Sequence, residues 1–117
     1  MININIDKKL SDKVNVHIAS IEAKVKTKES DKELLELIKK CEEIKENIKF
    51  DEVIKLKNIL SSRNAYKKLG KDPSRYRLSS ESLVKRVVKG NDLYIVNNIV
   101  DINNLISLHT CYSVGTY

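Results

Sequence analysis

Apolar and polar residues alternate along the first quarter of the chain, and this is the spacing of a half-buried β-strand. The alternation covers Met1–Ile6 and returns over Lys13–Lys26 after a short polar turn. In the second run the apolar side chains lie on one face up to Ile18 and on the other face from Ile21. Because a change of face needs an extra residue, the pattern predicts a bulge or two shorter strands there.

Helical spacing replaces the alternation beyond Ser30 and Asp31, which are residue types suited to cap the start of a helix. Apolar residues then recur every three or four positions, which predicts a long helix from Lys32 to about Ile48. The same spacing predicts a second helix over 51–69. Gly70 follows in the position where a left-handed residue ends a helix.

The second half of the chain continues this order of elements. We predict a loop over 71–78, a helix from Ser79 or Ser80 to Gly90, a helix over Ile99–Leu108 and a strand-like end at Thr110–Tyr117. The whole chain, residues 1–117, is therefore expected to be one α+β domain with a small mixed or antiparallel sheet packed by about four helices. The closing strand has no partner nearby, so we expect either a truncated chain or a sheet that another copy or a partner chain completes.

Composition limits the cellular location and the kinds of site that we expect for this domain. No apolar run approaches the ~18 residues of a membrane span, and the N-terminus lacks the basic and apolar regions of a signal peptide. Cys41 and Cys111 do not form a metal-binding motif, and the chain has only two histidines. We therefore expect a cytoplasmic protein with reduced thiols, no metal site and no membrane association.

The positive charge of the chain is concentrated in one segment. The net charge is +6, yet residues 61–90 hold nine cationic and two anionic residues, a local charge of +7. This concentration of positive charge suggests a surface that faces a polyanion, and phosphate is the commonest cellular anion of this kind. A solvated lysine-rich surface is an equally good interpretation of the charge alone.

Two groups of residues carry candidate chemistry. Asp101 and Asn104 are three residues apart, so a helix places them on one side among apolar residues. They either brace a neighbouring loop or line a small polar pocket in which an amide orients a carbonyl or a water. The second group contains Arg63, Arg75 and Arg77, whose guanidinium groups suit phosphate and carboxylate.

Aromatic and hydroxyl residues accompany these arginines. Tyr66 and Tyr76 are able to stack on a base or simply to pack, and packing is the better interpretation for Tyr66 beside a helical apolar stripe. Ser79 and Ser80 stand at a predicted helix start with no histidine near them in the sequence. We interpret them as capping residues rather than as nucleophiles.

Four consecutive motifs fill the second half of the chain. They are RNAYKKLGKDPSRYR at Arg63–Arg77, SSESLVKRVVKG at Ser79–Gly90, NNIVDINNLISL at Asn97–Leu108 and YSVGTY at the C-terminal end. Together, over Ser61–Tyr117, they resemble the tRNA-editing (B-three/B-four) domain of the phenylalanyl-tRNA synthetase beta subunit, and above all its free-standing relatives. The N-terminal half is similar to this domain only in layout.

The resemblance implies an α+β domain with an amino-acid-sized pocket near bound tRNA. Asn104 and Asp101 match the Asn and Asp of the family's Asp-x-x-Asn helix. Two departures are visible: residues 113–117 lack the histidine that the synthetase domain has after this helix, and Cys111 stands where relatives usually have glycine. The family domain also continues beyond this point, so the resemblance implies an incomplete editing pocket.

We therefore expect tRNA or aminoacyl-tRNA as the partner and no cofactor. The implied activity is aminoacyl-tRNA deacylation by water-mediated ester cleavage, with Asn104 and Asp101 as the catalytic candidates. Synthetase activity is not expected from this chain alone. The expected substrate-binding residues are Arg63, Tyr66, Arg75, Arg77 and Ser79. The alternatives are a non-catalytic RNA-binding module, an amino-acid-binding sensor and a remnant without function.

Overall fold

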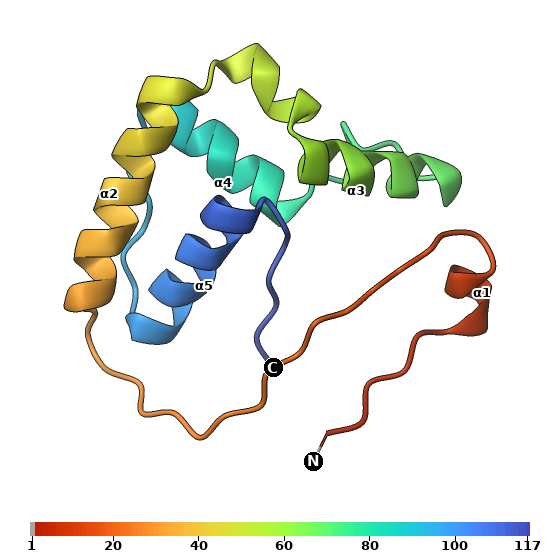
Figure 1. Cartoon of the computed structure of the whole chain (residues 1–117), viewed down its shortest axis with the longest axis horizontal. Helices are drawn as coiled ribbons and strands as arrows, with labels where there is room; N and C mark the ends of the chain where they lie inside the picture. The colour runs from red at the N-terminus through yellow and green to blue at the C-terminus, as the bar shows by residue number, and fades with distance from the viewer. Residues whose placement is uncertain (1) are drawn as a thin grey trace.

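The structure, a computed structural model, describes residues 2–117, and within them all regular elements are helical. Met1, the first residue of the first predicted strand, lies outside the described residues. In chain order the elements are α1 (Lys8–Ser11), α2 (Lys32–Asn47), the 3₁₀ helix η1 (Phe50–Lys55), α3 (Lys57–Lys68), α4 (Ser79–Val88) and α5 (Asn98–Thr110) (Figure 1).

The core lies where α2, α4 and α5 pack against one another, with η1 packed on α4 and α3 packed on η1. Each of these helices has one apolar face, and burying that face stabilises a helix more than its intrinsic propensity does. The buried core residues are Leu37, Ile44, Val53, Ile59, Leu78, Val84, Val87 and Leu108.

Three of the predicted helices are confirmed with small shifts at their ends, whereas the second is broken in two. The predicted helix over 51–69 divides into η1 and α3 at Leu56, whose backbone is extended with ψ 131°. Val53 and Ile59 are both fully buried. In one continuous helix these two side chains would point about 120° apart, so the break allows both of them to face the core.

The predicted capping residues agree with the structure in position at Asp31 but not at Ser79 or Ser80. Leu78 is the N-cap of α4, and Ser79 is its first helical residue, with no side-chain capping bond. At the start of α2 the N-cap is Asp31, again without a side-chain capping bond, and the Ser30 hydroxyl donates to Asp101 instead. The Ser30 hydroxyl, which the local sequence predicts as a helix cap, thus makes a tertiary contact instead.

The predicted sheet is wrong. Within residues 2–117 no strand is present, and the runs that alternate in sequence are extended segments of an N-terminal arm over 2–31 and a C-terminal tail over 111–117. Ile21 is 93% exposed, so alternation there buries no face. A strand forms only against a neighbouring strand, and the described residues bring none alongside these runs. The α+β prediction is therefore corrected to an all-helical structure.

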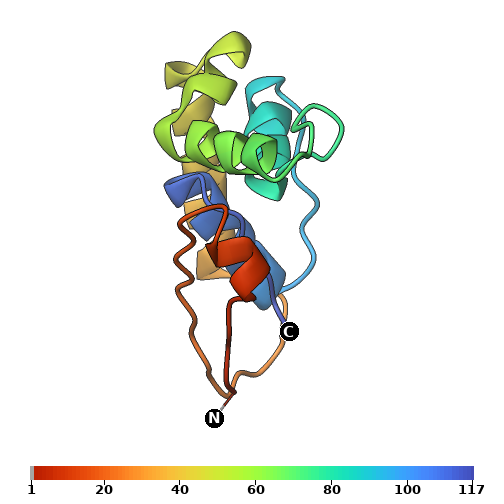
Figure 2. The same ribbon diagram turned by 90° about the vertical axis from the view of Figure 1, so that its right-hand side faces the viewer.

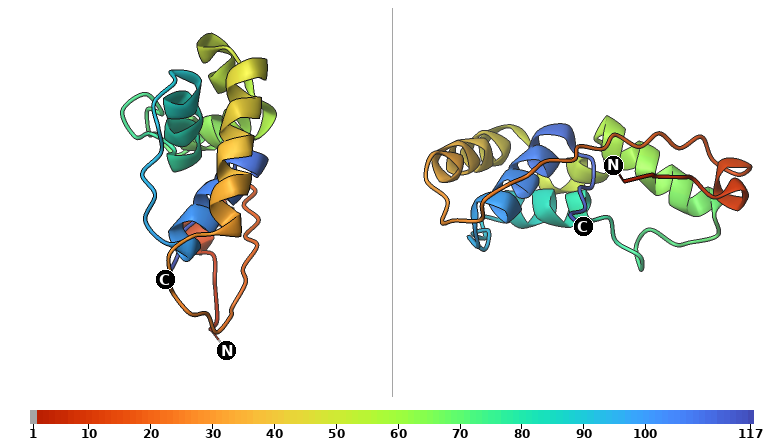
Figure 3. Two further views of the ribbon diagram at one scale, coloured as in Figure 1. Left: turned by 90° about the vertical axis from the view of Figure 1, so that its left-hand side faces the viewer. Right: turned by 90° about the horizontal axis from the view of Figure 1, so that it is seen from below.

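The molecule is thin, and its arm makes it wide. Its dimensions are 42 × 40 × 19 Å, and its radius of gyration of 15.5 Å exceeds the value of about 13 Å expected for a compact chain of this length. Figures 1 and 2 show the arm as a long loop outside the helical body. Figure 3 shows that the loop before α4, α4 itself and the segment after it lie along one broad face.

Candidate nucleic-acid interface

The turn between α3 and α4 positions the residues of the candidate interface. Gly70 has φ 77°, and its N–H donates to the carbonyl of Lys67 at 3.0 Å. The Lys71 N–H donates to the carbonyl of Tyr66 at 2.9 Å. This pair of bonds is a Schellman motif, which only a residue that tolerates positive φ completes without strain. The chain therefore reverses directly beside Tyr66.

A second set of hydrogen bonds closes the turn behind Asp72. The Asp72 carboxylate accepts from the Ser74 N–H at 3.0 Å and from its hydroxyl at 2.7 Å. These bonds lower the pKa of Asp72, with the backbone bond as the largest cause. The Asp72 carbonyl accepts from the Tyr76 N–H at 2.9 Å, and Pro73 is buried. The compact turn brings Tyr76 back toward the end of α3.

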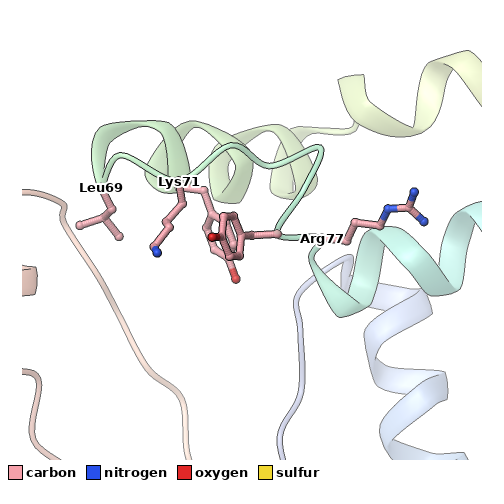
Figure 4. Close-up of a pocket in the computed structure, with 5 residues that line it drawn as sticks. Leu69, Lys71 and Arg77 are labelled. Carbon is pink, nitrogen blue, oxygen red and sulfur yellow. The ribbon is translucent and has the colours of Figure 1, made fainter.

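A surface pocket of about 530 Å³ lies inside this turn, lined by Tyr66, Leu69, Lys71, Tyr76 and Arg77. The Lys71 Nζ lies 4.6 Å from the centre of the Tyr76 ring, a cation–π distance. Figure 4 shows Leu69 at one end of the pocket and the Arg77 guanidinium extending away at the other. The pocket is widely open to solvent, so it is a surface depression rather than an enclosed cavity. Two phenol rings and the Lys71 ammonium, with the Arg77 guanidinium outside one end of the pocket, are groups that bind a base and a phosphate.

Arg63, another predicted binding residue, has a different neighbour. Its Nη1 lies 2.6 Å from Oε1 of Glu81, and Lys85 Nζ lies 2.8 Å from the same oxygen. Glu81 is 2% exposed, and the Arg63 side chain is 15% exposed. Burial alone would raise the pKa of Glu81, but the bonds from Lys85 and Arg63 outweigh it and lower the pKa. Arg63 thus joins α3 to α4 and does not line the pocket.

Asp101 is fully buried on α5 and holds two other segments of the chain. One carboxylate oxygen accepts from the Ser30 hydroxyl, and the other accepts from the Val96 N–H at 3.2 Å. One turn earlier, Asn98 accepts from the Lys28 N–H at 3.0 Å. Asp101 therefore braces the arm and the loop before α5. This is the structural role that the sequence allowed as the alternative to lining a polar pocket.

The remaining predicted site residues lie apart from one another. Asn104 is half-buried on α5 and is not among the residues that line the pocket. Arg75 and Ser79 are exposed, in the turn and in the first turn of α4 respectively. Of the predicted set, the structure brings Tyr66 and Arg77 together in the pocket. It does not bring Asn104 into it.

Lys71 belongs to the pocket and was not among the predicted binding residues, and Tyr76 had been weighed only as a stacking alternative. Neither lies on a helix, so helical periodicity gives no information about their direction. The usable signal was Gly70 followed by Pro73, which predicts a tight reversal and hence the return of the following aromatic residue toward α3. Glu81 was missed because its position in a Ser-Ser-Glu run is typical of an exposed first helical turn.

The end of α5 accounts for one departure from the family pattern. Cys111 has φ 61° and ψ 15°, which is the left-handed conformation in which relatives usually have glycine. A Cβ atom in that conformation costs about 1 kcal/mol. The Cys111 side chain packs against the core, and burial raises the pKa of its thiol, so it stays a protonated core residue near neutral pH.

Comparison with protein families matches residues 61–117, just under half of the chain, to the B3/4 domain. Over these residues the chain is similar to the B3/4 domain, which confirms the resemblance to this domain of the phenylalanyl-tRNA synthetase beta subunit that the motifs predicted. No curated protein and no solved structure shows a significant match to the chain. Among residues 2–117, no helix is long and apolar enough to cross a membrane.

Proposed function

We propose that this chain is an editing-type module that binds the aminoacylated 3′ end of tRNA in the pocket between α3 and α4. The observation that carries the proposal is the pocket itself, in which Lys71 lies over Tyr76 beside Tyr66 and Arg77. The pocket lies within the segment that matches the B3/4 domain.

Each group in the pocket supports recognition of a nucleotide end. Exposed tyrosine rings stack on unpaired bases whatever their identity, and Tyr76 is 50% exposed. Lys71 and Arg77 add positive charge for the phosphates of the same strand. The local charge of +7 over residues 61–90 would also attract the polyanion from solution. Tyr66 packs on the core with one side, which holds its ring in a fixed direction.

Ester hydrolysis is the activity that the resemblance implies, and Asn104 is the candidate that we retain for it. Its amide is able to donate and to accept. Because Asn104 does not line the pocket, it would orient the substrate carbonyl or a water only where the acylated end extends from the pocket toward α5. Asp101 has both oxygens engaged by the arm and the loop, so we assign it to positioning α5 rather than to contact with the substrate.

The test compares the affinity of the chain for aminoacylated and deacylated tRNA, and the rate at which the ester is lost. We expect Tyr76→Ala with Tyr66→Ala to weaken binding by about tenfold or more, because each lost stack is worth about 1–3 kcal/mol. Tyr112→Ala is the matched control, since Tyr112 is 53% exposed on the tail outside the pocket.

The outcomes separate the alternatives. Binding that distinguishes acylated from deacylated tRNA, with ester loss faster than in buffer, supports editing. Binding without turnover supports a non-catalytic RNA-binding module. Thermal stabilisation by a free amino acid and none by tRNA would replace the proposal with an amino-acid sensor. An unchanged affinity in the tyrosine double variant would show that the pocket is not the tRNA-binding site.

A second copy of the chain is the partner that we propose for the extended arm. Ile2, Ile4, Ile18 and Val25 are each more than half exposed on unpaired extended backbone. Such edges pair readily with strands of another chain. Light scattering should show a mass that doubles as the concentration rises, and a monomer at every concentration would contradict this part of the proposal.

A further inference from the structure

α4 carries a polar stripe that begins beside the tyrosine pocket. Ser79, Ser82, Arg86 and Lys89 are spaced by three or four residues, so they fall on one side of the helix. Val84 and Val87 lie on the opposite side, inside the core. Ser79, Ser82 and Lys89 are exposed, and the stripe contains hydroxyls and cations but no carboxylate.

The far end of this stripe has a second exposed aromatic ring. Tyr94 is 76% exposed, and the guanidinium carbon of Arg86 lies 4.7 Å from the centre of its ring. Arg86 Nε also donates to the Asp92 carbonyl at 2.7 Å, which fixes the guanidinium beside the loop. The arrangement repeats that of the pocket, in which Lys71 lies over Tyr76.

Both cation–aromatic pairs come from segments that lie along the same broad face. In all three orientations the loop before α4, α4 and the segment that follows it lie along one side of the molecule (Figures 2 and 3). A helix of ten residues is about 15 Å long, so the two exposed rings are separated by the length of a few nucleotides.

We propose that this face is a track for single-stranded RNA, running from the tyrosine pocket along the stripe of α4 to Tyr94. Bases stack on Tyr76 and Tyr94, and the phosphates between them contact Arg86, Lys89 and the serine hydroxyls. This combination of a positive groove and separate stacking rings is how proteins bind single strands without reading their sequence. The inference rests on the proposed function, since it takes the 3′ end to lie in the pocket.

Charge complementarity favours RNA as the occupant. The carboxylates on this face are Asp72, which accepts two bonds from Ser74, and Asp92 beside Arg86. Glu81 is buried and is neutralised by Arg63 and Lys85. The cations of the face are Lys71, Arg75, Arg77 and Arg86, and Lys89 lies at its edge, where its Nζ is 5.0 Å from the centre of the Phe50 ring of η1. A purely structural role, in which Arg86 offsets the dipole at the end of α4, would leave Tyr94 without a function.

The experiment measures the affinity of the full chain for RNA oligonucleotides of about 2 nucleotides, which reach the pocket alone, and of about 12 nucleotides, by fluorescence anisotropy. In the variant Arg86→Glu/Lys89→Glu we expect the longer RNA to bind about tenfold more weakly, while the shorter RNA keeps its affinity. The dependence of log affinity on log salt should become shallower by about 1.4, because two phosphate contacts are lost. Tyr94→Ala should also weaken only the longer RNA.

The control is Lys39→Glu/Lys45→Glu on α2, which makes the same change in net charge at exposed positions. An equal loss of affinity in the control and in the α4 variant would overturn the track. If the α4 double variant fails to fold by circular dichroism, Ser82→Glu and Lys89→Glu test the stripe singly at exposed positions.

The pocket and the track fail in different ways. Tyr66→Ala/Tyr76→Ala should abolish binding of the short RNA. If that variant leaves the short RNA bound but the α4 variant still weakens the long one, the proposed function fails and the track stands. If the tyrosine variant loses binding and the two charge-reversal variants behave alike, the pocket stands and the track is wrong.

Discussion

Glu81 illustrates how one buried charge joins two helices. Arg63 from α3 and Lys85 from α4 both donate to its Oε1, whereas its Oε2 is buried without a hydrogen-bond partner among the described residues. A carboxylate in this environment is stable only because two cations share the cost of burying it. The side chains that hold α3 against α4 are therefore charged, although the rest of the core is aliphatic.

Removal of this carboxylate should destabilise the fold. We expect Glu81→Ala to lower the free energy of unfolding by about 3–5 kcal/mol, because Arg63 would remain buried without a partner. Urea denaturation measures the change. Glu43→Ala is the control: its ion pair with Lys40 is on the surface of α2, where such pairs contribute about 0–1 kcal/mol. Equal effects of the two substitutions would contradict the structural role of Glu81.

The same ion cluster gives a pH dependence of known sign. The pKa of Glu81 is lower in the folded chain than its ordinary value of 4.5, so the folded state binds the proton less readily. The stabilisation is complete above pH 4.5 and is lost as the pH falls through the lowered folded pKa. The isosteric Glu81→Gln, melted over this range, should lack that component. Wild-type and variant curves of equal slope would contradict it.

At the residue scale, the sequence identified the important residues more reliably than it identified their roles. Arg63 and Asp101 were both expected in the binding or catalytic site, and the structure gives Arg63 the buried partner Glu81 and Asp101 the half-buried partner Ser30 instead. Helical spacing identifies the side of a helix on which a residue lies. It does not identify the segment that packs there, so Glu81 and Ser30 were not foreseeable as their partners.

Among the elements, the helices were predictable and the strands were not. α2, α4 and α5 follow from apolar spacing, and the reversals at Gly70 and Gly90 follow from glycine, since both residues have positive φ. These are local signals. A strand needs a second strand, which no local pattern supplies, and alternation over 13–26 therefore predicted a sheet that the described residues do not form. The break at Leu56 also depends on the core rather than on local spacing.

Asn98 should control how firmly the arm is attached to the helices. Its side chain accepts from the Lys28 N–H and donates to the Lys26 carbonyl at 3.1 Å. We expect Asn98→Ala to speed tryptic cleavage after Lys26 and Lys28 by about tenfold, because the open form becomes more populated. Asn47→Ala, which removes one side-chain bond at the end of α2, is the control. Unchanged cleavage in Asn98→Ala would show that the arm is held elsewhere.

At the scale of the whole molecule, a thin body places the pocket and α4 along one face. Because the body is thin, much of the basic segment over residues 61–90 lies at its surface (Figure 3). The motifs predicted the family and the basic character of this surface, both of which are sequence properties. The position of the pocket was not predictable, since it depends on how the turn after Gly70 folds back on α3.

The central claim is that the pocket between α3 and α4 holds the acylated 3′ end of tRNA. An NMR titration of the ¹⁵N-labelled chain with a short 3′-terminal RNA carrying an amide-linked aminoacyl group tests it most directly. We predict saturable shifts at the amides of Tyr66, Leu69, Lys71, Tyr76 and Arg77, larger than those caused by the same RNA without the aminoacyl group. Shifts confined to α2 and the outer side of α5, or no saturable shifts in the turn, would contradict the account.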